Sequence, residues 1–180
     1  MKARSMSSKG VSYYTGRGDN GYSYTLKNKV SKDSDLIQAV GDIDELQAFL
    51  GYAWGKTKDK EIRAIIEQIV YDLYLLNAVI AGFEGNVFSE RKTKDLERLI
   101  DLYAKKIKPI KSFVYPFGTE AAILINICRT LARKAERSIV KVTKYGEILS
   151  YMNRLSSLLY VLYRYENERN GFKDKTLRIR

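Results

Sequence analysis

The sequence of 180 residues contains no histidine. Histidine is the usual general base near neutral pH and the commonest protein ligand of metal ions. Its absence excludes imidazole catalysis, and it also excludes an imidazole from this chain as the axial ligand of a tetrapyrrole. Any chemistry must therefore use carboxylates, arginine, lysine, hydroxyl and amide side chains, or the reactivity of the substrate itself.

Cysteine and long apolar runs are also scarce. Cys128 is the only cysteine, so no internal disulfide can form and a cysteine-built metal site is disfavoured. No apolar run approaches the roughly 18 residues of a membrane-spanning helix. Residues 1–10 are polar and basic and lack the apolar core of a secretory signal. These features predict a protein of the reducing cytoplasm that does not enter a membrane.

Acidic residues are outnumbered, with 21 against 32 basic ones, which gives a formal net charge of +11. Such a charge favours an anionic partner, and nucleic acid, a nucleotide and an acidic membrane surface all remain candidates. Fourteen tyrosines would suit stacking on bases. Most of them lie at helical spacing beside leucine and isoleucine, however, which favours a helical core or an interface.

The apolar pattern divides the chain into three parts. Residues 1–33 are rich in Gly, Ser, Tyr and Lys, and predict a flexible basic start, a Gly-rich loop and one or two short extended pieces. Residues 34–170 show helical periodicity, with Ser34 as a candidate N-cap and Gly82 as a helix stop. Residues 171–180 form a basic tail that we expect to be mobile. The five predicted helices cover residues 35–54, 59–81, 93–107, 119–145 and 148–169. Five such helices with short connections predict an all-α protein, an antiparallel five-helix bundle.

One face of the predicted helix 119–145 carries a row of charged side chains. Arg129, Arg133, Glu136 and Arg137 follow helical spacing and share this face. Arginine offers a fork of donors that matches phosphate oxygens, and the glutamate could orient an arginine or a metal-bound water. The alternative is a solvated face with i,i+4 salt bridges, which add only about 0.3–0.5 kcal/mol each.

A second candidate is the Gly-rich segment Thr15-Gly16-Arg17-Gly18-Asp19-Asn20-Gly21, followed by Ser23, Thr25 and Lys32. Glycine lets backbone N–H groups approach an anion closely, and the hydroxyls and the lysine can add contacts. The segment is not a Walker A motif, because it lacks the Gly-Lys-Ser/Thr sequence and no strand-to-helix turn follows. An ordinary hairpin turn is the alternative.

Three further segments carry polar or apolar side chains that need an explanation. Asp44 and Glu45 point about 100° apart on their helix, so at most one of them faces a given pocket; either one pairs with a basic residue of another helix or both form a solvated patch. The segment that contains Phe113 precedes the arginine-bearing helix, and either caps the core or walls a hydrophobic ligand. Asn153 lies among apolar residues and needs a hydrogen-bond partner from the protein or from a ligand.

Taken in order, these segments resemble the PduO-type ATP:cob(I)alamin adenosyltransferase family. The family has a T-x-x-G-D-x-G loop with a later lysine, then G-x-x-D-E-L, F-x-x-P-G-G, R-x-x-x-R-R-A-E-R and N-R-L-S-D. The corresponding segments begin at Thr15, Gly41, Phe113, Arg129 and Asn153. The match spans nearly the whole chain, and the order and spacing of the five motifs make it specific.

The resemblance implies a homotrimer of five-helix bundles whose active sites lie between subunits. The family transfers the 5′-deoxyadenosyl group of ATP to cob(I)alamin with Mg²⁺, and a cobalamin reductase is an implied partner. The implied ATP-binding residues are Thr15, Gly18, Asp19, Gly21, Ser23, Lys32, Arg133, Glu136, Arg137 and Asn153. Asp44 and Arg129 match residues that pair across the subunit boundary, and Phe113 matches an aromatic that crowds the lower face of the corrin.

The chain departs from the family pattern at several positions. Lys134 stands where arginine is usual, Phe117-Gly118 replaces a Gly-Gly pair, and Ser157 replaces the aspartate of N-R-L-S-D. Gly16 and Arg17 exchange the usual small and basic positions. These changes concern local detail: a stiffer loop before the arginine-bearing helix, and the loss or replacement of any salt bridge made by that aspartate.

The residues agree with this chemistry, because Co(I) is itself the nucleophile and needs no histidine base. The leaving triphosphate needs arginine, lysine and Mg²⁺ to spread its charge. Two alternatives come from other classes of protein. A basic helical nucleic-acid-binding protein would bind polynucleotide with strong salt dependence. A helical scaffold without chemistry would leave the Gly-rich loop unexplained.

Overall fold

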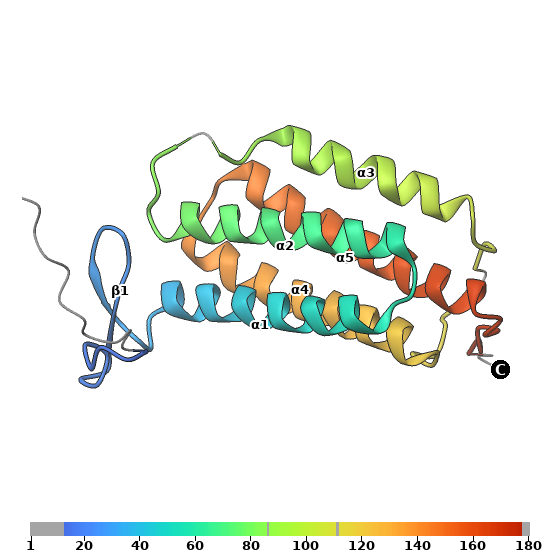
Figure 1. Cartoon of the computed structure of the whole chain (residues 1–180). Helices are drawn as coiled ribbons and strands as arrows, with labels where there is room; N and C mark the ends of the chain where they lie inside the picture. Colours follow the sequence, from blue (N-terminus) through green and yellow to red (C-terminus); the bar gives the residue numbers. More distant parts are fainter. Residues whose placement is uncertain (1–12, 86, 111, 178–180) are drawn as a thin grey trace, which may run out of the picture.

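The computed structural model describes residues 13–85, 87–110 and 112–177. It confirms the all-α prediction: five helices form an up-and-down bundle in which consecutive helices run in opposite directions (Figure 1). The helices are α1 (Asp35–Lys56), α2 (Lys60–Ile80), α3 (Glu90–Ala104), α4 (Glu120–Val142) and α5 (Gly146–Arg169). Every end lies within three residues of its predicted position. None of these helices is long and apolar enough to cross a membrane, as far as the described residues go.

Local side chains determine where the helices begin and end. Ser34, the predicted N-cap, accepts a hydrogen bond from Ile37 N at the start of α1. Thr119 does the same for Ala122 N at the start of α4. These caps satisfy backbone donors that have no partner inside the helix. Gly82 follows α2 with φ of +102°, a conformation that side chains rarely adopt, and confirms the predicted stop.

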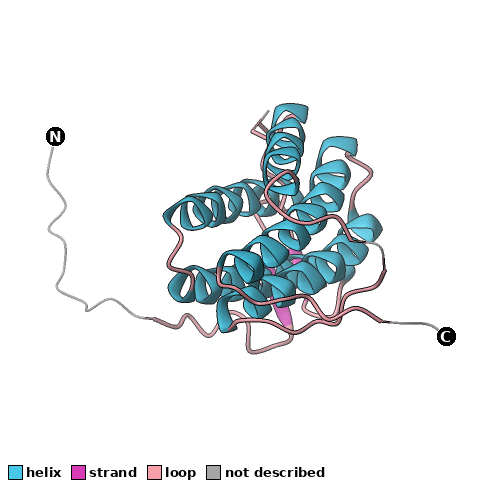
Figure 2. Ribbon diagram, turned by 90° about the vertical axis from the view of Figure 1, so that its right-hand side faces the viewer, coloured by secondary structure: helices cyan, strands magenta, loops and turns pink. Residues whose placement is uncertain are grey.

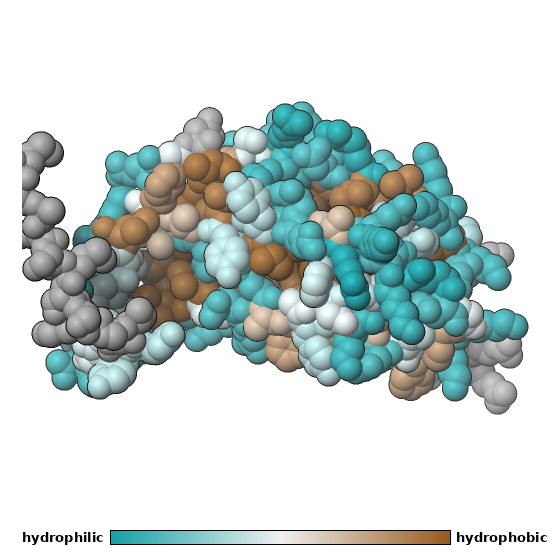
Figure 3. All heavy atoms as spheres, in the orientation of Figure 1, coloured by the Kyte–Doolittle hydropathy of each residue, from teal (hydrophilic) through white to brown (hydrophobic). Residues whose placement is uncertain are grey.

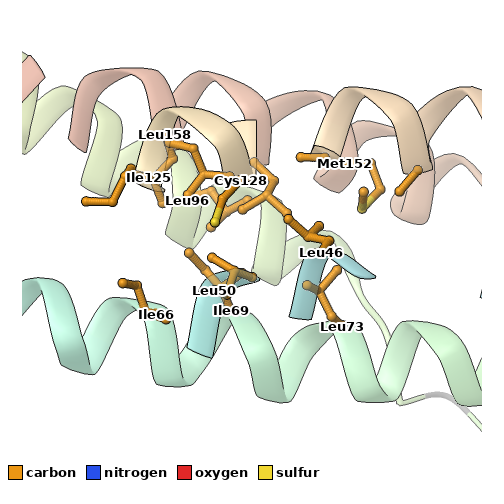
Figure 4. Packing of buried hydrophobic residues seen from close by; sticks show 14 of the residues in the cluster. Leu46, Leu50, Ile66, Ile69, Leu73, Leu96, Ile125, Cys128, Met152 and Leu158 are labelled. Atoms are coloured by element: carbon orange, nitrogen blue, oxygen red, sulfur yellow. The ribbon is translucent and has the colours of Figure 1, made fainter. Parts of the chain in front are cut away.

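The core lies between α1, α4 and α5, with α2 packed on α1 and α3 on α5. Leu46, Leu50 and Leu158 surround Cys128 there (Figure 4). Burial raises the pKa of the Cys128 thiol to about 12. The thiol therefore stays protonated and packs as a small apolar side chain rather than acting as a nucleophile.

The two ends of the bundle carry different loops (Figure 1). A two-stranded antiparallel hairpin, β1 (Tyr22–Tyr24) with β2 (Lys29–Ser31), precedes α1 and confirms the predicted short extended pieces. The linker before α4 and the C-terminal segment lie at the opposite end. Viewed from that end, loop segments cross in front of the helices (Figure 2). The face in Figure 3 is mostly hydrophilic, with apolar patches toward the hairpin end.

Candidate functional site

The outward face of α4 carries arginines that no described residue neutralises. Arg133 and Arg137 are exposed, and neither forms an ion pair or hydrogen bond with any described residue. Arg129, further along the same face, is half-buried and its Nε donates to Asn126 Oδ1 at 2.7 Å. A face held together by i,i+4 salt bridges is therefore not what the structure contains. Arg133 and Arg137 keep their full charge available for an anionic ligand.

Glu136 lies on the same helix and pairs with an amide instead of an arginine. Asn153 Nδ2, on α5, donates to Glu136 Oε1 at 3.3 Å. The expectation that Asn153 needs a partner is confirmed, but the residue is exposed rather than enclosed by apolar neighbours. Arg133, Glu136, Arg137 and Asn153 thus form one surface along the outer side of α4 and α5, which we call the arginine face.

The acidic motif of α1 contacts α4 through Glu45 and not through Asp44. Lys134 Nζ lies 2.5 Å from Glu45 Oε2 and 3.1 Å from Asp42 Oδ1. Asp44 is exposed and has no ion pair among the described residues. Lys134 therefore joins α4 to α1 within the chain.

Sequence reasoning did not single out Asp42. Its carboxylate is only 3% exposed and also accepts hydrogen bonds from Ser138 Oγ at 2.5 Å and Gln38 Nε2 at 2.8 Å. Burial would raise the pKa of Asp42, but the hydrogen bonds from Ser138, Lys134 and Gln38 and the charge of Lys134 outweigh it and hold the pKa below its ordinary value. The i,i+3 spacing of Asp42 and Glu45, opposite the i,i+4 spacing of Lys134 and Ser138, was a signal for this cluster.

The Gly-rich segment and Lys32 lie together, as predicted. The side chain of Lys32 crosses Gly18 so closely that a Cβ there would stand 3.0 Å from Lys32 Nζ. Lys32 N donates to Gly21 O at 2.9 Å, and Gly16 and Gly21 have φ of +67° and +76°. The positive φ of Gly16 and Gly21 favours glycine at these two positions, whereas at Gly18 the flexible end of Lys32 would have to shift for a side chain. The segment leads into the hairpin, which agrees with the hairpin interpretation; binding of an anion by the glycine loop stays a prediction.

This loop lies at the end of the bundle where α4 finishes. Asp35, in the first turn of α1, pairs with Lys141 in the last turn of α4 at 3.0 Å. Thr15, Asp19 and Ser23 belong to the segment that precedes α1 (Figure 1). Thr15 Oγ1 accepts from Arg17 N at 3.4 Å, and Ser23 is paired with Val30 in the hairpin. The loop is therefore at the Arg137 end of α4.

Phe113 lies at the opposite end, on a loop with a fixed backbone. Its ring is 77% exposed, so it does not cap the core. Its carbonyl accepts from Leu177 N at 2.8 Å, and Tyr115 N donates to Lys175 O at 2.8 Å. The expected mobile tail is thus paired with this loop as far as Leu177.

Buried polar side chains of α5 hold the same loop from inside. Phe117 O accepts from Tyr163 Oη at 2.8 Å and from Asn167 Nδ2 at 3.0 Å. Arg164, almost fully buried, donates through Nη2 to Lys108 O at 2.9 Å and through Nε to Asp174 Oδ2 at 2.9 Å. The loop therefore presents Phe113 to solvent on a rigid support.

Phe113 and the arginine face do not meet within one chain. Phe113 precedes α4, whereas Arg133 lies 13 residues beyond Glu120, which corresponds to roughly 20 Å along the axis. Asp44 and Arg129, likewise, make no contact with each other in the described structure. A site that uses both Phe113 and Arg133 needs a large ligand or a second copy of the chain.

The described residues form an antiparallel helical bundle, with two arginines left unpaired among them on one face and an exposed aromatic at one end. This defines a class of helical-bundle protein whose face suits an anionic ligand and whose sequence offers no imidazole base. A family model narrows the class to one family. The model described as cobalamin adenosyltransferase matches residues 13–166. The chain belongs to the cobalamin adenosyltransferase family, and it is an enzyme of the transferase class.

Individual relatives agree with this assignment. The corrinoid adenosyltransferase of Bacillus subtilis is 32% identical over 172 residues, which cover 89% of each chain. The corrinoid adenosyltransferase MMAB of Mus musculus is 30% identical over 178 residues, covering 90% of this chain and 75% of the relative. A variant of the PduO-type ATP:corrinoid adenosyltransferase from Lactobacillus reuteri, solved with cobalamin and ATP, superimposes with a TM-score of 0.87 at 27% identity and covers 93% of this chain and 97% of that one.

Proposed function

We propose that the arginine face binds the triphosphate of ATP while the chain transfers the 5′-deoxyadenosyl group to cob(I)alamin, giving adenosylcobalamin and triphosphate. ATP-dependent adenosylation of cobalamin is the activity of this family, and a related structure contains both substrates. The observation that carries the assignment of residues is that Arg133 and Arg137 are exposed and unpaired in the described structure. Charge left without a partner on a helix face is available for phosphate.

The remaining residues proposed to bind ATP are those that the family motifs imply. Lys32 and the loop with Thr15, Gly18, Asp19, Gly21 and Ser23 would wrap the triphosphate. Arg133, Glu136 and Arg137 would hold the phosphates and the surroundings of a metal ion, and Asn153 would contact the nucleotide. Support comes from the close approach of Lys32 to Gly18 and from the hydrogen bond between Asn153 and Glu136.

The mechanism asks little of the protein beyond orientation and charge. Cob(I)alamin attacks C5′ of ATP through cobalt, so no side chain needs to remove a proton. Negative charge develops on the departing triphosphate, and preorganised arginines stabilise it more in the transition state than in the ground state. Holding C5′ in line with cobalt supplies much of the remaining acceleration.

A magnesium ion fits this site as a companion of ATP. No group of three or more acidic or thiol side chains that could hold a metal occurs within residues 13–85, 87–110 and 112–177. Mg²⁺ commonly keeps several waters and binds through phosphates with one or two carboxylates, and Glu136 is the carboxylate of the arginine face. The ion would supply charge neutralisation on the phosphates.

The complete site would lie between subunits of a homotrimer. Asp44 has no ion-pair partner within the described part of its own chain, and we infer that it pairs with Arg129 of a neighbouring subunit. Phe113, on its supported loop, would crowd the lower face of the corrin and exclude water and an axial ligand. Loss of that ligand makes Co(II) easier to reduce, and a cobalamin reductase would then supply the electron. A nucleic-acid-binding function has no support among the relatives.

Binding of Mg²⁺-ATP by calorimetry tests the assignment of the arginine face. Arg133→Ala should weaken binding because one charged contact to phosphate is lost. Arg98→Ala is the matched control, because Arg98 is also an exposed arginine, on α3, and pairs with Asp95 at 2.7 Å. Equal affinities for the two variants and the unaltered protein would remove Arg133 from the site.

A further inference from the structure

Two charged side chains of opposite sign determine which way the amide of Asn153 points. Arg154 Nη1 donates to Asn153 Oδ1 at 3.0 Å, and Asn153 Nδ2 donates to Glu136 Oε1 at 3.3 Å. A guanidinium can only donate and a carboxylate can only accept. Turning the amide by 180° would place its NH₂ group against the guanidinium and its oxygen against the carboxylate. Only one orientation of Asn153 therefore makes both hydrogen bonds.

Arg154 is itself held in place from a third helix. Its Nε donates to Glu97 Oε1 of α3 at 2.8 Å, and α3 packs directly on α5. The row therefore runs from Glu97 on α3 through Arg154 and Asn153 on α5 to Glu136 on α4. Arg154 and Glu97 are both nearly half exposed. An ion pair with that exposure contributes only about 0–1 kcal/mol to stability, so its loss should leave the fold intact.

We propose that Glu97 and Arg154 are positioning residues for nucleotide binding, acting through the orientation of Asn153. The inference rests on the proposed contact between Asn153 and the nucleotide. With one N–H used by Glu136 and one lone pair used by Arg154, the amide keeps one N–H and one lone pair for a ligand. Their directions are fixed before ATP arrives, so binding does not have to order the side chain. Helix α3 thereby influences a site that it does not touch.

Steady-state kinetics with chemically reduced cobalamin and varied ATP test this inference. Glu97→Ala should raise KM for ATP about three- to tenfold, the range that one hydrogen bond's net contribution allows, with little change in kcat. Glu97→Gln keeps an acceptor oxygen for Arg154 and should restore most of the affinity. Glu90→Ala is the matched control, because Glu90 lies on the same helix and pairs with Lys94 at 3.1 Å; its KM should stay unchanged.

A double variant separates positioning from a general structural effect. If Glu97 acts through Asn153, then adding Glu97→Ala to Asn153→Ala should raise KM no further than Asn153→Ala alone. Additive effects would overturn the inference, as would an unchanged KM for Glu97→Ala beside a raised KM for Asn153→Ala. A normal KM for Asn153→Ala has a different meaning: it would contradict the proposed nucleotide contact itself, and the inference with it.

Discussion

Asp42 of α1 and Lys134 of α4 form an ion pair in which the carboxylate is buried and the ammonium reaches it from the surface. The Nζ–Oδ1 distance is 3.1 Å, and Ser138 and Gln38 donate two further hydrogen bonds to the carboxylate. The pair fixes the register of α4 against α1. That register sets which residues of α4 face outward, so a buried cluster that sequence motifs did not reveal supports the arginine face.

Asp42→Asn should therefore destabilise the fold by about 2 kcal/mol at pH 7, because a neutral amide replaces the buried carboxylate that accepts these hydrogen bonds. The pKa of Asp42 in the folded protein is below its unfolded value of 3.8. The stability that the Asp42 carboxylate contributes is therefore fully present above pH 3.8 and is lost as the pH falls through the lower pKa of the folded state. Denaturant unfolding at pH 7 and at about pH 3 should show the difference between the two proteins narrowing in acid. A difference that stays constant with pH would mean that the charge of Asp42 does not stabilise the fold. Asp35→Asn, at an exposed pair with Lys141, is the control and should cost little.

Gly118→Ala should be strongly destabilising, by about 2 kcal/mol or more, because overpacking a filled position forces its neighbours to move. A Cβ on Gly118 would stand 2.2 Å from Oδ1 of Asn167, a fully buried side chain that also bonds Thr119 N and Phe117 O. Gly146→Ala is the matched control, since a Cβ added there would meet nothing within 4 Å among the described residues. Thermal unfolding of both variants should give a lower melting temperature for Gly118→Ala than for Gly146→Ala, and equal melting temperatures would contradict the predicted clash with Asn167.

The helices were predictable because their apolar periodicity, caps and glycine stops are local signals. Ser34 and Gly82 illustrate this, since each acts through neighbours in sequence. The cluster around Asp42 was only partly predictable. Helical spacing marks Asp42 with Glu45 and Lys134 with Ser138 as pairs that share a face, but which faces meet depends on the register between α1 and α4. The pairing of the tail with the Phe113 loop was missed for a similar reason: residues 113–115 and 175–177 carry no pattern that marks them as partners.

The proposed pairing of Asp44 with Arg129 across subunits predicts that charge reversal is reciprocal. Asp44→Arg and Arg129→Asp should each weaken the proposed trimer, because like charges would then meet at the subunit boundary. The double variant restores opposite charges and should recover assembly, measured by light scattering over a range of concentrations. Arg129 also bonds Asn126, so recovery should be compared with Asn126→Ala. Singles that assemble normally, or a double variant no better than the singles, would contradict the pairing.

Phe113→Ala should leave the fold intact, because the ring is exposed and its loop is held through backbone atoms. If Phe113 crowds the lower face of the corrin as proposed, the variant should impair the reduction-coupled reaction that starts from cob(II)alamin, since water or the cofactor's own base could then bind at that face. With cobalamin already reduced to Co(I), much of the activity should survive. The two assays belong on one preparation. If both rates fall equally, or ATP affinity falls instead, Phe113 does not act on the corrin.

Anaerobic turnover with ATP, Mg²⁺ and chemically reduced cobalamin tests most directly whether Arg133 and Arg137 of α4, unpaired among the described residues, promote displacement of triphosphate by Co(I). The corrin spectrum should change to that of adenosylcobalamin, with one triphosphate released for each corrin adenosylated. Arg133→Ala should lower kcat/KM roughly 30- to 1,000-fold, which corresponds to a loss of about 2–4 kcal/mol of transition-state stabilisation. Arg98→Ala, the control on α3, should turn over normally. Turnover by Arg133→Ala equal to that of the unaltered protein at limiting ATP would contradict the account.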